Sequence, residues 1–141
     1  MNWIYDNKEI LSLDDFPTNC VGFIYKITNT INGRIYVGKK VLFNSHRSTI
    51  SKREKTITKT RKKFKVIVKE SNWKTYFGSC KELQEDIKKY GEQYFVREIL
   101  EFCHSKRYMT YCEVKYQFKY EVLENDSYNS NIMSKFYKGN I

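Results

Sequence analysis

The alternation of apolar and polar positions predicts two paired strands early in the chain. Residues 21–28 (VGFIYKIT) and 34–38 (RIYVG) are rich in aromatic and β-branched side chains, which are typical of strands. Asn32 and Gly33 lie between the two runs, and this dipeptide readily adopts the positive φ angles of a tight turn. The pattern therefore predicts an antiparallel hairpin across the Asn32-Gly33 turn.

Further along, the pattern predicts a helix, a third strand and a longer helix. Ser79 followed by Glu82 is the signature of a capping box, and the helix that it opens should end at Gly91. Residues 94–102 (YFVREILEF) predict a strand. Apolar residues spaced by three or four predict the longest helix over residues 105–124.

This order of elements predicts an α+β fold, in which a small antiparallel three-stranded sheet is flanked by helices. The predicted domain covers residues 21–141, with a basic insertion after the second strand. Within it, residues 128–136 are expected to be irregular or briefly extended and folded back on the core. Residues 1–20 form an acidic N-terminal arm in which the sequence predicts no element.

The size and composition fit one soluble domain. The chain has 141 residues, of which 40% are hydrophobic and 30% charged, so it can bury one core. It has neither a long apolar run nor the basic and apolar start of a signal peptide, so we expect a cytoplasmic protein without membrane contact. The cysteines lack zinc or redox spacing and are expected to be reduced and mostly buried: Cys20, Cys80, Cys103 and Cys112.

The positive charge is concentrated in one segment. The formal net charge is +10, and residues 39–69 contain twelve basic residues against one acid, Glu54. Because these charges repel one another, the segment is expected to be an extended or mobile loop. Lysine and arginine neutralise phosphates, so we expect residues 40–69 to contact a nucleic-acid backbone. The candidate contacts are Lys40, His46, Lys52, Arg53, Arg61, Lys62, Lys63 and Lys65; the alternative is a solvated loop that only aids solubility.

Three short motifs carry a resemblance to a known family. The predicted hairpin contains Phe23-Ile24-Tyr25 on its first strand and Tyr36-Val37-Gly38 on its second. This pair of tripeptides resembles the signature of the GIY-YIG nucleases, over about residues 20–136. A W-K-x-Y-x-G-S segment at residues 73–79 makes the chain most similar to phage-encoded homing-endonuclease-like members.

The resemblance implies a set of site residues and a metal ion. It places Tyr25 and Tyr36 at the attacking water and Lys39 at the phosphate or the nucleophile. It makes Glu113 the ligand of Mg²⁺, for which Mn²⁺ can substitute, and Asn129 a support of the site through hydrogen bonds. Gly38 should let the DNA phosphate approach the backbone, since a side chain there would block it.

Several of these assignments have alternatives. The family's arginine corresponds by position to Arg47, although Arg53 or Arg61 could serve if the basic segment shifts the register, and His46 could carry a proton. Asn131 competes with Asn129. Glu113 follows Thr110 in a T-x-x-E pattern, so it could simply complete a capping box.

The resemblance therefore implies a metal-dependent DNA endonuclease, of a phage homing type or one that attacks a competing genome. The alternative is a non-catalytic nucleic-acid-binding or inhibitory module on the same fold. No separate recognition domain is evident, so sequence preference would come from the basic segment, the N-terminal arm, a homodimer or a partner protein. A module that mostly contacts phosphates should cut with low specificity.

Overall fold

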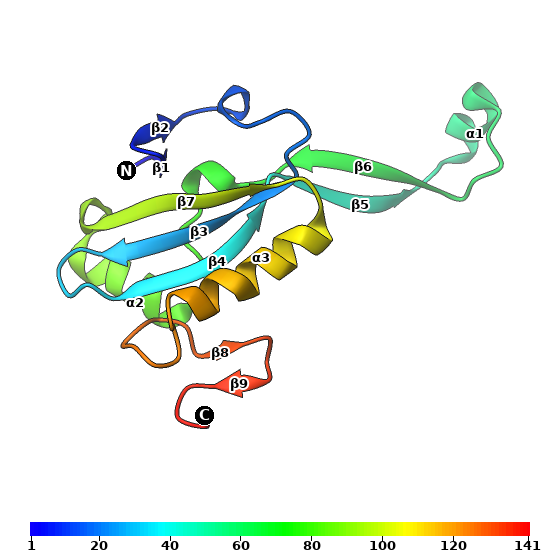
Figure 1. Cartoon of the computed structure of the whole chain (residues 1–141). Helices are drawn as coiled ribbons and strands as arrows, with labels where there is room; N and C mark the ends of the chain where they lie inside the picture. Colours follow the sequence, from blue (N-terminus) through cyan, green and yellow to red (C-terminus); the bar gives the residue numbers. More distant parts are fainter.

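The computed structural model describes residues 1–141 and is built around a five-stranded sheet of order β2-β1-β7-β3-β4. Figure 1 shows this sheet with α3 along one face and α2 on the other. The strands are β1 (Trp3–Tyr5), β2 (Lys8–Ile10), β3 (Gly22–Asn29), β4 (Ile35–Val41) and β7 (Phe95–Cys103).

The predicted hairpin is confirmed. β3 and β4 pair antiparallel in a continuous register from Gly22↔Val41 to Thr28↔Ile35. Gly33 has the expected positive φ of 77°, whereas Asn32 does not have one. The connection is therefore a loop over residues 30–34 and not a two-residue turn.

The predicted α+β class is confirmed, and the three predicted strands, β3, β4 and β7, pair antiparallel. The limit to three strands is wrong, because the sheet has five strands and is mixed. β1 pairs parallel with β7, at Trp3↔Arg97 and Ile4↔Glu98, and β2 folds back on β1. Trp3 anchors this addition: its side chain is buried and its indole Nε1 donates to the carbonyl of Trp73 at 2.6 Å. Strands of three residues are too short to show a period in the sequence, which is why residues 1–20 gave no prediction.

The helices are α1 (Lys52–Thr58), α2 (Lys81–Tyr90) and α3 (Lys106–Lys119), with short 3₁₀ turns at Leu13–Asp15, Trp73–Thr75 and Glu92–Tyr94. Gly91 ends α2 as predicted, but the N-cap is Cys80 without a side-chain cap, so the Ser79 capping box is wrong. α3 begins next to Ser105, as predicted, and the Ser105 hydroxyl caps it by accepting from the Tyr108 N–H. α3 ends at Lys119 and not at residue 124, since Glu121 has a positive φ of 51°.

Two cores form, one on each face of the sheet. Phe23 and Tyr25 pack with Trp73 and Leu83 on the α2 side, whereas Ile24 packs under α3. Because β3 is covered on both faces, its sequence reads as a nearly continuous apolar run. The four cysteines are free, as expected, and three of them are buried.

The C-terminal residues fold back on the second core, as predicted. β8 (Asn131–Ile132) and β9 (Phe136–Tyr137) form a short hairpin, and Ile132 is buried under α3. None of the helices is long and apolar enough to cross a membrane.

The basic segment is more ordered than predicted. β5 (Phe43–Thr49) and β6 (Phe64–Glu70) pair antiparallel over seven residues, with α1 between them. Residues 43–70, which we call the basic hairpin, project from one end of the sheet with α1 at the tip (Figure 1). The prediction of an extended chain is confirmed for β5 and β6, whereas the loop at the tip contains a helix.

Candidate active site

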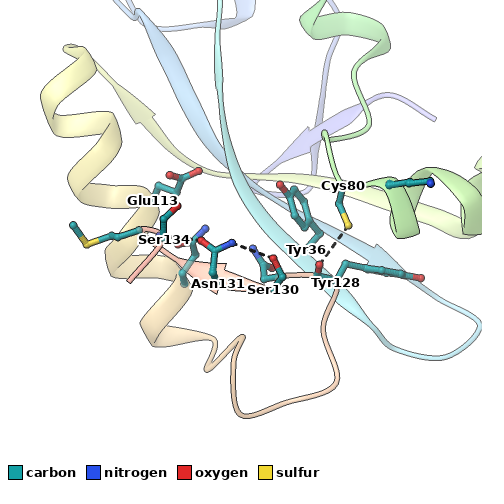
Figure 2. A pocket seen from close by; sticks show the side chains of 11 residues that line it. Tyr36, Cys80, Glu113, Tyr128, Ser130, Asn131 and Ser134 are labelled. Atoms are coloured by element: carbon teal, nitrogen blue, oxygen red, sulfur yellow. Dashed lines mark hydrogen bonds between the residues drawn. The ribbon is translucent and has the colours of Figure 1, made fainter. Parts of the chain in front are cut away.

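A cavity of about 470 Å³ lies at the outer edge of β4, between the start of α2, the middle of α3 and the segment 128–134 (Figure 2). We call it the edge cavity. β4 is the last strand of the sheet, so its outer backbone groups have no partner strand. The residues that line the cavity are Tyr36, Cys80, Lys81, Glu113, Gln117, Tyr128, Asn129, Ser130, Asn131, Met133 and Ser134.

Asn129 closes part of this open edge. Its side chain is buried, its Oδ1 accepts from the Val37 N–H at 3.0 Å, and its Nδ2 donates to the Val37 carbonyl at 2.9 Å. Gln117 on α3 donates to the same carbonyl at 3.2 Å. Asn131 bonds only its neighbours, the Ser130 hydroxyl and the Ser134 N–H. Of the two candidate asparagines, Asn129 is therefore the one that holds β4 in place.

Glu113 enters the edge cavity from α3. Because Ser105 caps this helix, Thr110 lies inside it, and the alternative capping-box role of Glu113 is wrong. The carboxyl is half-buried, and burial raises its pKa, while the charge and a backbone hydrogen bond of Lys39 act in the opposite direction. Lys39 itself donates to the Thr110 hydroxyl at 2.9 Å, so it lies against α3 beside Glu113.

The two motif tyrosines occupy different environments. Their ring centroids are 6.1 Å apart, but Tyr36 lines the edge cavity, whereas Tyr25 lies beneath it and is only 1% exposed. The Tyr36 hydroxyl lies 3.4 Å from the Ser79 hydroxyl, with either as the donor. Burial raises the pKa of both phenols, so both are protonated at neutral pH and can donate hydrogen bonds.

Gly38 is required by the tyrosines. A Cβ at this position would lie 2.6 Å from the Tyr25 hydroxyl oxygen and 3.2 Å from Cε1 of Tyr36. The expected reason was room for a DNA phosphate. The structure gives a different one, since the Tyr25 ring fills the space over the Gly38 backbone.

Lys40 lies on the opposite face of β4 from Lys39. It is half-buried, and its ammonium lies 4.0 Å from the centroid of the Tyr76 ring. Burial lowers its pKa.

The structure does not bring Arg47 to the edge cavity. Arg47 and His46 are exposed on β5, and the Arg47 guanidinium stacks at 4.2 Å on the Phe64 ring of β6. The other candidate arginines also lie on the basic hairpin, Arg53 in α1 and Arg61 in the loop that follows it. The remaining predicted contacts are exposed there too: Lys52, Lys62, Lys63 and Lys65, the last paired with Glu54 at 2.6 Å.

Several residues of the edge cavity were missed in the sequence. Gln117 follows Glu113 by four residues, so helical spacing alone would have placed it on the same face of α3. Lys81 is the first residue of α2 and lines the cavity. The sequence predicts the N-cap at Ser79 and not at Cys80, so it does not place Lys81 at the start of the helix. Ser130 and Ser134 belong to a short hairpin that has no sequence signal.

The chemistry of the edge cavity fits Mg²⁺. Glu113 is its only acidic residue, and no three His, Cys, Asp or Glu side chains converge anywhere in the chain. A soft metal such as Zn²⁺ would need several such ligands. Mg²⁺ prefers oxygen, keeps several waters and is often held by one or two carboxylates. Glu113 could hold it, with the nearby hydroxyl and amide groups as partners for its waters.

Comparison with known families identifies the family of the chain. The profile described as "Putative endonuclease segE, GIY-YIG domain" matches residues 3–141. The chain belongs to the segE GIY-YIG family. The match covers residues 3–141, so it includes the strands β1 and β2 and the basic hairpin. Members of the wider GIY-YIG group generally use Mg²⁺. Searches of curated proteins and of solved structures gave no significant match.

Proposed function

We propose that this GIY-YIG domain is a Mg²⁺-dependent endonuclease that hydrolyses DNA phosphodiester bonds, with a phage homing or genome-competition role. One observation carries the proposal: Glu113, Tyr36 and Asn129 come from distant parts of the chain and line the same cavity at the open edge of β4. A carboxylate beside a phenol suits water activation and metal binding at a phosphate.

Each residue has a distinct task in this reaction. Glu113 would hold Mg²⁺, and this ion would neutralise the negative charge that develops on the phosphate and on the leaving oxygen. Tyr36 is protonated at neutral pH and can donate a hydrogen bond in the cavity to a phosphate oxygen. Tyr25 supports Tyr36 from below, and Asn129 fixes the backbone of β4 between Tyr36 and Gly38. Lys39 opposes the rise in the pKa of Glu113 that burial causes, through its charge and a backbone hydrogen bond.

The basic hairpin binds the DNA backbone. Its lysines and arginines are exposed, and neutralising phosphates with them releases counterions. Such contacts carry no sequence information, so the domain alone should cut many sites. Sequence preference would then require a second copy of the chain or a partner protein.

The test is cleavage of supercoiled plasmid by the wild type and by Glu113→Gln, with Mg²⁺ or with EDTA. Losing the metal's charge stabilisation costs several kcal/mol, so Glu113→Gln should cut about 10³-fold more slowly. Glu85→Gln makes the same change at an exposed position on α2 and should cut like the wild type.

Three outcomes separate the possibilities. Cutting that requires Mg²⁺ and disappears in Glu113→Gln supports the proposal. Salt-sensitive DNA binding without any cutting would favour the non-catalytic binding module. If Glu113→Gln still cuts, the protein is a nuclease but Glu113 is not its metal ligand.

A further inference from the structure

Hydrolysis of a phosphodiester puts additional negative charge on the phosphate oxygens, and a fixed cation at the reacting group stabilises it. Arg47 was the sequence-based candidate, but it stacks on Phe64 in the basic hairpin. Lys39 is already engaged by Thr110 and Glu113. Lys81 lines the edge cavity at the start of α2, but its side chain is exposed to solvent. The other cation near the tyrosines lies on β4 itself.

Lys40 is placed for this task by the geometry of β4. Side chains two residues apart on a strand lie on the same face, so Lys40 shares a face with Gly38 and Tyr36. The register confirms this, since Gly38 is paired with Tyr25 and Lys40 with Phe23. The Lys40 side chain therefore lies on the same face of the sheet as Tyr25 of β3 and Tyr36 of β4.

Tyr76 connects Lys40 to the tyrosines. The Lys40 ammonium lies 4.0 Å from the Tyr76 ring centroid, a distance typical of a cation–π contact. The Tyr76 ring in turn packs edge-to-face on Tyr25, with centroids 5.9 Å apart and planes at 85°. Tyr76 belongs to the W-K-x-Y-x-G-S segment, whose position in the fold is fixed by the buried Trp73.

Lys40 also lacks a counter-ion. No carboxylate lies within 4 Å of its ammonium, although it is half-buried. A partly desolvated charge without an acidic partner is unfavourable, and an anion that binds there would remove the cost. By contrast, Lys26 on β3 and Arg34 in the β3–β4 loop each have acidic partners.

We infer that the Lys40 ammonium, held on the Tyr76 ring, contacts a non-bridging oxygen of the DNA phosphate that is engaged at Tyr36 and Glu113. This inference rests on the proposed nuclease function. Lys40 is then a catalytic residue, and Tyr76 positions it.

The test compares Lys40→Gln and Lys40→Arg with the wild type in single-turnover cleavage at saturating protein and in binding of duplex DNA in EDTA. Removal of one group that stabilises transition-state charge costs about 10²-fold in rate. Lys40→Gln should lose this factor while its Kd changes by less than about 10-fold, as expected for one phosphate contact. Lys40→Arg keeps the charge and should recover most of the rate.

Lys89→Gln is the matched control, because Lys89 also lies over a tyrosine ring, that of Tyr90, at 5.1 Å. It is exposed at the far end of α2, and its variant should cleave like the wild type. For the positioning role, Tyr76→Phe keeps the ring and should retain the rate, whereas Tyr76→Leu should lose about 10-fold in rate with little change in Kd.

The inference is overturned if Lys40→Gln cleaves like Lys89→Gln, or if its whole defect appears in Kd, as for an ordinary backbone contact. In both cases the wild type still cuts and the proposed function stands. A wild type that binds DNA but does not cut in Mg²⁺ overturns both the proposed function and the role of Lys40. Equal thermal unfolding of Lys40→Gln and wild type confirms that a lost rate is not lost folding.

Discussion

The chain contains two antiparallel strand pairs of similar length that are stabilised in different ways. In the β3–β4 pair, six of the eight residues of β3 are buried and the other two are half-buried. In the β5–β6 pair of the basic hairpin, no side chain is buried. An isolated two-stranded hairpin is marginally stable in water. The comparison indicates that the sheet holds the proposed reacting groups rigidly, whereas the basic hairpin can adapt its shape to the DNA backbone that we propose it binds.

Positive charge is used differently in the two regions as well. At the β3–β4 loop, Arg34 pairs with Glu82, Asp86 and Asp126 and stacks at 4.1 Å on the Tyr128 ring. In the basic hairpin, ten basic residues share two acids, Glu54 and Glu70. Arg34 therefore stabilises the fold, whereas most cations of the basic hairpin remain available for phosphate.

The largest expected effect comes from a buried cation of the sheet. Arg97 is 2% exposed, lies between the Trp3 and Phe77 rings, and donates to the carbonyls of Lys74, Tyr76 and Met1. Arg97→Met leaves these carbonyls without their donor, and we expect the free energy of unfolding to fall by about 3 kcal/mol. Urea unfolding measures it.

Arg107→Met is the control, since Arg107 is exposed on α3 and should change stability by less than about 0.5 kcal/mol. If Arg97→Met also changes the free energy of unfolding by less than about 0.5 kcal/mol, the cation at this position does not join β1 and residues 73–76 to the sheet.

Removal of the basic hairpin should lower DNA affinity and leave the stability of the sheet nearly unchanged. Leu42 and Ser71 flank it and are already joined, because the Ser71 N–H donates to the Leu42 carbonyl at 2.8 Å. A short Gly-Ser turn in place of residues 43–70 should leave the thermal unfolding of the sheet nearly unchanged. It removes a net charge of +8, so DNA affinity at low salt should fall by about 10² to 10³-fold and the salt dependence of Kd should flatten.

Binding titrations at several salt concentrations, together with a thermal melt, measure both properties. A shortened protein that melts much earlier would show that the basic hairpin unfolds as one unit with the sheet. A shortened protein that keeps both affinity and salt slope would place the DNA contacts on the sheet.

The same difference explains what the sequence could predict. The β3–β4 hairpin, β7 and the start of α3 follow from burial, since each has a face that must be apolar. β5 (FNSHRST) buries neither face, so it shows no period, even though its partner contains the run Phe64–Val68. Arg47 was placed by counting residues from Gly38, and the hairpin inserted there carries it away from the cavity.

Local signals also failed where tertiary contacts decide the outcome. Ser79 fits a capping box, but its hydroxyl lies beside that of Tyr36, and the preceding Gly78 has a positive φ of 82°. The helix therefore starts two residues later, at Lys81. The tyrosines, Lys39, Glu113 and Asn129 could be named from motifs, whereas the cation–π contact of Lys40 with Tyr76 depends on a segment 36 positions away.

The smallest expected effect concerns acid stability of the sheet and its helix. Glu101 on β7 accepts from the Tyr116 hydroxyl at 2.8 Å and from the Cys112 thiol at 3.0 Å, both on α3. Burial alone would raise the pKa of Glu101, but the hydrogen bonds from Cys112, Tyr108 and Tyr116 outweigh it and lower the pKa to about 2. Because the folded pKa is lowered, this stabilisation is present above the unfolded pKa and is lost as pH falls from about 4.5 towards 2.

Glu101→Gln should therefore be less stable than the wild type at pH 6. The expected loss is only about 1 kcal/mol, because solvent partly screens the Glu101 carboxylate of the wild type. The difference between the two proteins should shrink at pH 3. Unfolding in urea across this range measures it. The protein that lacks residues 43–70 should show the same pH dependence, because Glu101 and its partners all lie on β7 and α3. A difference that remains constant with pH would mean that Glu101 joins the strand to the helix by packing and not by its charge.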